Sequence, residues 1–173
     1  LEDMYPVILR PMQHYGSQDL HFCKDKAEFD KARDKIAGDY YASTYIKKDR
    51  EIRVFVVSGR VVAMLEKFPP DKKLISWGGV DGEGEWLYIK WSQWPLECAR
   101  VACESFVHSG LDFGAIDMMM EKNKAYCLEI NTAPDIWGYY GGCVGTALKY
   151  AMDRNDRSYI LPVGANDFKR YIH

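Results

Sequence analysis

The chain has 173 residues, enough for one domain or a pair of small subdomains with a substantial core. Hydrophobic residues make up 47% of it, as in ordinary globular proteins, and the net charge is only -2. This charge gives no reason to expect nucleic acid or an anionic membrane as a partner, and no uncharged apolar run reaches the length of a membrane span.

The chain opens with a strand, a loop and a helix. Residues 5–10 form a short apolar run that ends in a cation and predicts a buried strand, and residues 11–19 read as a polar loop. Asp25 can cap a helix that Gly38 ends. Residues 40–46 are aromatic and β-prone, which predicts a second strand.

The middle of the chain holds the clearest hairpin. Two apolar strands within residues 53–65 flank Ser58 and Gly59, and glycine supplies the positive φ that such a turn needs. Residues 68–90 are rich in glycine, proline and charge. This segment is long enough to be a functional loop rather than a simple connection.

Two further helices are expected. One runs from Pro95 to about Ser109 and is ended by Gly110, and the other covers residues 141–153. With the strands between them, the elements predict an α+β fold. We expect a largely antiparallel sheet with helices packed on one side.

Two acidic residues and an asparagine carry the strongest functional signal. Glu129 and Asn131 are two apart on a strand-like run, so their side chains share a face. Asp117 lies on another such run, and the polar residues 121–124 between the two predict a hairpin. If residues 122–124 form its loop, Asp117 falls opposite Glu129.

Carboxylate and amide oxygens are the ligands that hard cations prefer. We therefore interpret Asp117, Glu129 and Asn131 as ligands of Mg²⁺, with Mn²⁺ as an alternative. The alternative reading is that they are solvated residues at a sheet edge. The apolar neighbours make both strands look buried, however, and ionised carboxylates are rarely buried without a partner or a metal.

The five cysteines predict the compartment. They are odd in number, form no Cys-x-x-Cys pair and mostly lie in apolar runs. This pattern favours buried, reduced thiols over disulfides or a metal site, and we expect a cytoplasmic protein. The cysteines are Cys23, Cys98, Cys103, Cys127 and Cys143.

These pieces, in this order, resemble the C-terminal part of an ATP-grasp domain. The resemblance is closest to the branch that contains ribosomal-protein glutamate ligases and related peptide ligases. Residues 114–117 followed by 128–134 resemble its metal-binding block, and residues 51–53 resemble the Asp-Ile-Arg before its hairpin. Residues 6–11 resemble a strand that ends in a phosphate-binding lysine, with arginine here in its place.

The resemblance implies roles for specific residues. Nucleotide contacts are implied for a strand-end cation, a glycine-serine loop and three hinge residues, namely Arg10, Gly16, Ser17, Thr44, Tyr45 and Ile46. Catalytic roles are implied for the cations Arg10, Arg53 and Lys67. Thr44 stands where the family has a glutamate, which leaves the hinge contacts open. The alternative for Arg53 is a surface ion pair with Glu51.

The implied function is ATP-dependent ligation of a carboxylate donor to an amine acceptor through an acyl phosphate, with ATP and Mg²⁺ as cofactors. Two alternatives stay open, an ATP-grasp kinase with a hydroxyl acceptor and a non-catalytic remnant that acts as a binding module. Residues 1–50 would form a small phosphate- and adenine-binding part of one domain, and residues 51–173 the metal-binding part with the C-terminal helix. The family's earlier subdomain does not precede Leu1, so we expect a fold incomplete at the N-terminus, completed by a further segment or a partner chain.

Overall fold

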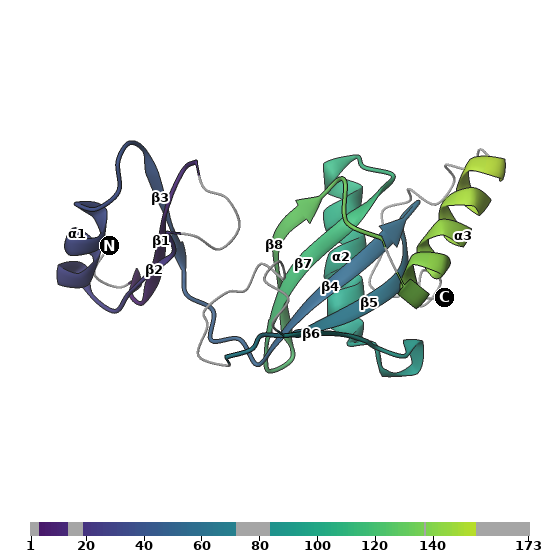
Figure 1. Ribbon diagram of the computed structural model, residues 1–173, viewed down its shortest axis with the longest axis horizontal. Coiled ribbons are helices and arrows are strands. Elements are labelled where there is room, and N and C mark those ends of the chain that lie inside the picture. Colours follow the sequence, from purple (N-terminus) through teal and green to yellow (C-terminus); the bar gives the residue numbers. More distant parts are fainter. Residues whose placement is uncertain (1–3, 14–18, 72–83, 137, 155–173) are drawn as a thin grey trace. The chain divides into compact units, whose positions relative to one another are not determined.

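The computed structural model resolves the chain into two compact units, each with its own antiparallel sheet (Figure 1). The residues that the structure describes are 4–13, 19–71, 84–136 and 138–154. The first unit contains the described residues up to 47 together with 69–71 and 84, and the second contains 48–68 and those from 85 onward. Most of the glycine-rich segment 68–90 lies outside the described residues.

The first unit is a three-stranded sheet with one helix. Its strand order is β2 (His21–Cys23), β1 (Val7–Pro11) and β3 (Tyr40–Thr44), and its helix is α1 (Lys26–Arg33). The predicted cap is present, because the Asp25 carboxylate accepts a 2.9 Å hydrogen bond from the Glu28 amide. The helix ends earlier than Gly38. Tight turns replace it, in which Lys35 and Ile36 donate to carbonyls three residues back.

The second unit is a five-stranded sheet in the order β6, β5, β4, β7, β8. The strands are β4 (Arg50–Val57), β5 (Arg60–Phe68), β6 (Glu85–Tyr88), β7 (Phe113–Glu121) and β8 (Lys124–Asn131). The predicted hairpin is confirmed as β4 and β5, and both turn residues, Ser58 and Gly59, have positive φ. The helices are α2 (Leu96–Ser109) and α3 (Gly138–Arg154), with a short 3₁₀ helix η2 (Trp91–Gln93) before α2.

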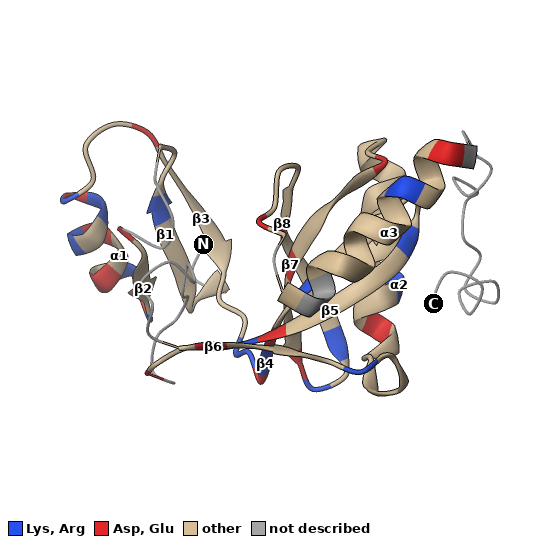
Figure 2. Ribbon diagram, turned by 45° about the vertical axis from the view of Figure 1, so that its right-hand side comes forward, with Lys and Arg blue, Asp and Glu red and all other residues tan. Residues whose placement is uncertain are grey.

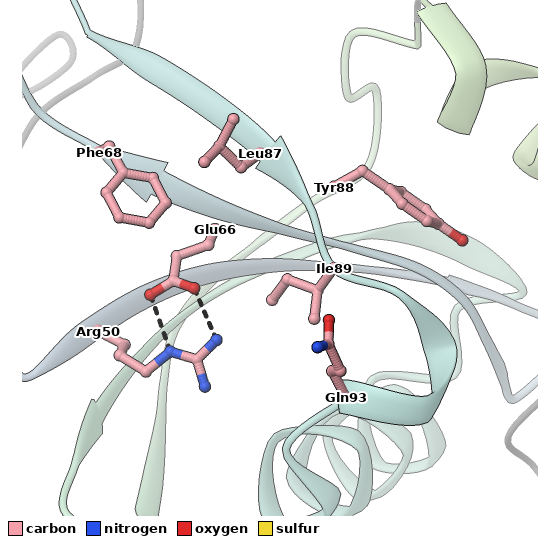
Figure 3. Close-up of a pocket in the computed structure, with 7 residues that line it drawn as sticks. All are labelled: Arg50, Glu66, Phe68, Leu87, Tyr88, Ile89 and Gln93. Atoms are coloured by element: carbon pink, nitrogen blue, oxygen red, sulfur yellow. Dashed lines mark hydrogen bonds and ion pairs between the residues drawn. The ribbon is translucent and has the colours of Figure 1, made fainter.

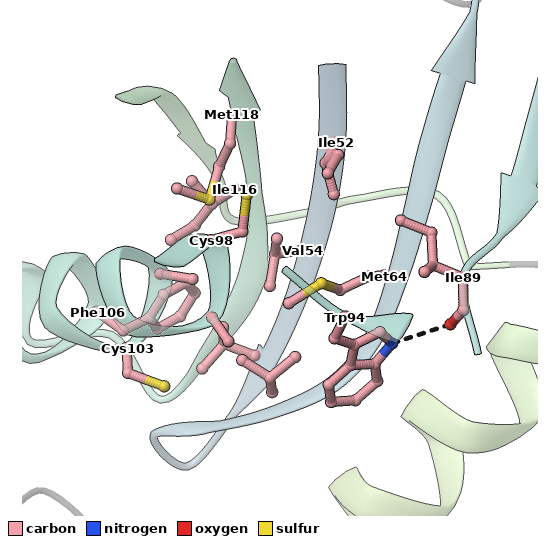
Figure 4. Packing of buried hydrophobic residues seen from close by; sticks show 14 of the residues in the cluster. Ile52, Val54, Met64, Ile89, Trp94, Cys98, Cys103, Phe106, Ile116 and Met118 are labelled. Carbon is pink, nitrogen blue, oxygen red and sulfur yellow. Dashed lines mark hydrogen bonds between the residues drawn. The ribbon is translucent and has the colours of Figure 1, made fainter. Parts of the chain in front are cut away.

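Both faces of this sheet carry a helix. Ile52, Val54 and Val56 of β4 pack with α2 in one buried cluster (Figure 4). Phe55 and Val57 point to the other face, where they pack with residues of α3. The antiparallel α+β architecture is confirmed, but the helices lie on two faces rather than one. The unbroken apolar run through the end of β4 is the signal of burial on both sides.

Gly114 of β7 allows β8 and α2 to approach closely. A Cβ atom at this position would lie 2.6 Å from the carbonyl oxygen of Asn131 and 3.1 Å from the ring of Phe106. Contacts this short require the backbone of β8 to move. Gly114 therefore fixes the position of the strand end that carries Asn131.

We expect Gly114→Ala to lower the free energy of unfolding by about 1–3 kcal/mol, the usual range for overpacking a filled core. Urea denaturation followed by tryptophan fluorescence measures this change. The matched control is Gly142→Ala in α3, where a Cβ would meet nothing within 4 Å. That control should keep or raise stability, because alanine favours a helix over glycine by roughly 1 kcal/mol. Equal effects of the two substitutions would contradict the close approach.

Candidate functional site

Asp117 lies opposite Glu129, as the sequence predicts, but by a different route. The turn between β7 and β8 has two residues, because Glu121 pairs with Lys124. A β-bulge then shifts the register next to Asp117, so that Leu128 has no partner across the pair. The expected three-residue turn is therefore wrong, and the bulge restores the pairing.

Asp117 is also the centre of a row across the sheet. Arg53 of β4 lies opposite it and donates two hydrogen bonds to its carboxylate, from Nε to Oδ1 at 2.7 Å and from Nη2 to Oδ2 at 2.8 Å. Lys67 of β5 adds a third from Nζ to Oδ2 at 3.0 Å. Asp117 is almost fully buried. Two cations from neighbouring strands thus neutralise one buried carboxylate.

The same ion pairs extend to a second buried acid, Glu51. Its Oε1 accepts from Lys67 Nζ at 3.0 Å, and its Oε2 accepts from Lys48 Nζ at 2.6 Å. The five residues Lys48, Glu51, Arg53, Lys67 and Asp117 are termed the polar cluster. It holds three cations and two carboxylates, a formal charge of +1.

An aromatic ring lies against two of these cations. The Arg53 guanidinium carbon is 4.8 Å and Lys67 Nζ is 5.0 Å from the centre of the Trp86 ring on β6. The electron-rich ring face attracts both charges. Figure 2 shows acidic and basic residues gathered where β4 begins and β5 ends. The excess positive charge and its apolar backing suit the binding of an anion.

The surroundings of Asp117 control its ionisation. Burial raises the pKa of this carboxyl, but the hydrogen bond from Arg53 and the charges of Lys67 and Arg53 more than offset it, so the pKa lies below the ordinary value. Asp117 is therefore an ionised carboxylate at neutral pH.

This lowered pKa predicts how acid affects stability. The Asp117 contribution is complete above the pKa of the unfolded chain, about 3.9, and is lost as the pH falls through the lower pKa of the folded chain. The difference in unfolding free energy between wild type and Asp117→Asn should be constant from about pH 7 to 5 and shrink below about pH 4. Urea titrations across this range measure it. A difference that stays constant to about pH 2.5 would show that Asp117 does not titrate as described.

Glu129 and Asn131 lie on β8 beside this row. The Asn131 amide donates from Nδ2 to Glu129 Oε1 at 3.2 Å, so its own oxygen is not used in that bond. Glu129 is exposed and Asn131 is half-buried. Together with the Asp117 carboxylate they offer two carboxylates and one amide oxygen, which are donor types that a hard cation takes. Among the described residues, no group of three or more His, Cys, Asp or Glu side chains is arranged to hold a metal, so a metal site here would depend on Asn131.

The predicted nucleotide residues belong to the first unit. Arg10 is half-buried on β1, opposite Tyr41, and Thr44 ends β3 opposite Val7. The Tyr45 amide donates to the Pro6 carbonyl at 3.1 Å, so a backbone contact from Tyr45 to adenine would use its carbonyl oxygen. Ile46 follows as a half-buried residue. The predicted loop residues Gly16 and Ser17 lie outside the described residues.

Sequence reasoning missed Lys48 and the burial of Glu51. Glu51 lies two residues before Arg53 on β4, so both side chains leave the same face of the strand. That alternation was the available signal, but it indicated only a surface pair. Both residues belong instead to the buried network around Lys67 and Asp117.

All five cysteines are free thiols, and three of them are buried. Burial raises the pKa of Cys98 and of Cys103 to about 12, so both remain protonated at neutral pH. These two thiols are unsuited to act as nucleophiles.

A separate open pocket is lined by residues of β4, β5 and β6 and of the segment that follows β6 (Figure 3). Arg50 and Glu66 contribute to it and form a two-point ion pair at 2.8 and 2.6 Å. Both alternate along their strands with members of the polar cluster, so they face the opposite side of the sheet. Its volume is about 410 Å³, and its lining residues are Arg50, Glu66, Phe68, Leu87, Tyr88, Ile89 and Gln93.

No protein-family model matches the sequence, and no curated protein sequence matches it. Solved structures do match the fold. The D-alanine–D-alanine ligase of Bacillus anthracis has a TM-score of 0.55 at 15% identity, over 96% of this chain and 54% of its own. A RiPP-associated ATP-grasp ligase of Chryseobacterium gregarium, in complex with ADP and a leader and core peptide, has a TM-score of 0.60 at 15% identity, over 88% and 50%.

The L-amino acid ligase of Bacillus licheniformis matches with a TM-score of 0.55 at 16% identity, over 98% of this chain and 42% of its own. The chain thus spans about half the length of these structures. None of the described helices is both long and apolar enough to cross a membrane. The resemblance drawn from the sequence is confirmed at the level of the fold, and the chain has the fold of the ATP-grasp ligases.

Proposed function

We propose that the protein is an ATP-dependent carboxylate–amine ligase of the peptide-forming type, acting in the cytoplasm, and that this chain supplies its metal and phosphate site. The observation that carries the proposal is the arrangement on one sheet face of an ATP-grasp fold. Arg53 and Lys67 meet at Asp117, and Glu129 with Asn131 lies beside it. This arrangement supports the proposal, because a magnesium–nucleotide complex needs cations for its phosphates beside oxygens for its metal.

Nucleotide-binding roles are also proposed for residues of the first unit, each by itself. Arg10 is proposed to bind phosphate, for which the guanidinium fork is suited. Backbone groups of Thr44, Tyr45 and Ile46 are proposed to contact the adenine. Gly16 and Ser17 are proposed to approach phosphate through their amides.

The reaction would proceed in two steps. An oxygen of the donor carboxylate attacks the γ-phosphorus of ATP, which forms an acyl phosphate and releases ADP. The amine then attacks the acyl carbon, which forms the amide and releases phosphate and a proton. Arg53 and Lys67 would donate hydrogen bonds to the phosphoryl oxygens as charge develops on them.

Mg²⁺ bound at Asp117, Glu129 and Asn131 would screen the charge of the phosphates and align them for transfer. Glu129 would supply an exposed carboxylate and Asn131 an amide oxygen. Trp86 would exclude water from Arg53 and Lys67, which strengthens the electrostatic interactions of these two cations. The substrates would be amino acids or peptides, in keeping with the peptide bound in the C. gregarium structure.

Trapping with hydroxylamine tests this function. The chain, together with the segment or partner chain expected to complete the fold, is incubated with ATP, Mg²⁺ and a set of amino acids and peptides, and hydroxamates are measured by mass spectrometry. A hydroxamate that requires both ATP and the carboxylate is the expected result, because hydroxylamine intercepts an acyl phosphate. ATP consumption with phosphate on a hydroxyl and no hydroxamate would identify a kinase. Nucleotide binding without turnover would identify a binding module, and either result would overturn the ligase.

A further inference from the structure

Both oxygens of the Asp117 carboxylate are engaged by cations of the protein itself. Arg53 binds one oxygen through Nε and the other through Nη2, and Lys67 binds the second oxygen. A metal ion that coordinates this carboxylate would lie next to an ammonium group and would be repelled by it. Metal binding at Asp117 therefore requires that one of these cations give way.

We propose that Lys67 is a displaceable counter-ion of Asp117, which neutralises this carboxylate in the metal-free protein and shifts onto Glu51 when a divalent cation binds. The inference rests on the metal site of the proposed function and adds a device that controls access to it. The exchange needs no covalent step. It needs a second acid within reach of Lys67, and Glu51 is that acid.

The geometry identifies Lys67, rather than Arg53, as the group that moves. Arg53 holds Asp117 by a planar two-point pair, the stronger arrangement. Lys67 holds Asp117 by one bond at 3.0 Å and has an equal bond to Glu51, also at 3.0 Å. Its ammonium has three donors on a flexible stem and can rotate between the two acids.

The burial of Lys67 explains why the exchange needs Glu51 as a second partner. Lys67 and Glu51 have side chains only 4% exposed, so neither charge can be left without a partner. When Lys67 leaves Asp117, Glu51 keeps its charge compensated, and the Trp86 ring, whose centre is 5.0 Å from Lys67 Nζ, also attracts it. Lys48 binds only the far oxygen of Glu51, at 2.6 Å, and so leaves the near oxygen to Lys67. Glu51 thus acts as a positioning residue for the exchange.

Competition for the Asp117 carboxylate predicts the direction in which each substitution changes metal affinity. Because Lys67 and the metal exclude each other at Asp117, removing the lysine must strengthen metal binding, by the reciprocity of linked equilibria. Removing Glu51 must weaken it, because Lys67 then depends on Asp117 alone. Lys67→Met and Glu51→Gln should therefore shift metal affinity in opposite directions.

The experiment measures binding of Mn²⁺ alone to the nucleotide-free chain, by the loss of the free-ion signal in electron paramagnetic resonance. Lys67→Met should bind Mn²⁺ on the order of tenfold more tightly than wild type, within the usual range of such couplings. The matched control is Lys48→Met, which removes a cation of the same cluster that contacts Glu51 but is not bonded to Asp117. It should change the affinity by less than about threefold. If both variants raise the Mn²⁺ affinity equally, the gain comes only from removing a positive charge near the site, and the proposed exchange is overturned.

A double-mutant cycle sharpens the comparison. In the Asp117→Asn background, Lys67→Met should lose its effect on Mn²⁺ affinity, because the contested carboxylate is gone. Persistence of the full gain would contradict the proposal. If Asp117→Asn does not fold, the exchange is tested by comparing the Mn²⁺ affinities of Lys67→Met and Lys48→Met alone.

Failure of the metal site and failure of the exchange give different results. If Glu129→Gln and Asn131→Ala leave Mn²⁺ binding unchanged, the metal site itself is misassigned and the exchange falls with it. If both substitutions weaken Mn²⁺ binding while Lys67→Met and Lys48→Met have the same Mn²⁺ affinity, the metal site is supported and only the exchange is overturned.

Discussion

Asp117→Asn should lower the free energy of unfolding by about 3–5 kcal/mol, the usual cost of removing one partner from a buried ion pair. The substitution keeps the size of the side chain but removes the charge that Arg53 and Lys67 share. Both cations then remain in a site where Asp117 is only 5% exposed, facing a neutral amide. Urea denaturation at neutral pH measures the loss.

The control for this prediction is an ion pair at the surface. Glu104 of α2 accepts from Arg100 at 2.7 Å, and both side chains are about one-third exposed. Because such pairs contribute little, Glu104→Gln should cost less than about 1 kcal/mol. If Asp117→Asn costs no more than Glu104→Gln, the polar cluster does not hold these strands together.

Glu129→Gln should have the opposite profile, with little effect on folding and a large effect on metal binding. Glu129 is exposed and, among the described residues, accepts a hydrogen bond from Asn131 alone, so stability should change by no more than about 0.5 kcal/mol. Loss of a direct carboxylate ligand should weaken metal-dependent binding or turnover on the order of a hundredfold or more. Thermal unfolding and Mn²⁺ titration measure the two effects.

Glu85→Gln is the matched control for Glu129→Gln. It also removes one exposed acid from an edge strand of the same sheet, on β6 at the opposite edge. This variant should leave both stability and Mn²⁺ affinity close to wild type. Unfolding of Glu129→Gln would make Glu129 structural, and a Mn²⁺ affinity equal to that of Glu85→Gln would remove it from the metal site.

The sequence predicted those elements whose signals are local. The Ser58-Gly59 turn, the Asp25 cap and the Gly110 stop of α2 depend on residues next to one another, and all three are present. The placement of α3 was missed because the apolar run at the end of β4 indicates that both faces are buried but not which helix covers the second face, and this is decided by tertiary packing. The bulge at Leu128 was missed because nothing local distinguishes it from a longer turn.

The candidate site also has one part that local sequence predicted and one part that it did not. Alternation along one hairpin was enough to bring Asp117 opposite Glu129. The role of Glu51 could not be predicted, because its partner Lys67 lies on another strand and the link to Asp117 runs through the order β5, β4, β7. A charge on a strand is usually solvated. Only the assembled sheet shows that Glu51 is buried.

Binding of ATP to the wild-type chain with and without Mg²⁺ tests the central claim most directly. Isothermal titration calorimetry is performed in excess Mg²⁺ and again in EDTA, with all other conditions held fixed. If Asp117, Glu129 and Asn131 hold the metal that binds the phosphates, saturable binding should appear with Mg²⁺ and weaken at least about tenfold in EDTA. Equal affinity under both conditions, or no binding at millimolar ATP with Mg²⁺ present, would contradict this assignment.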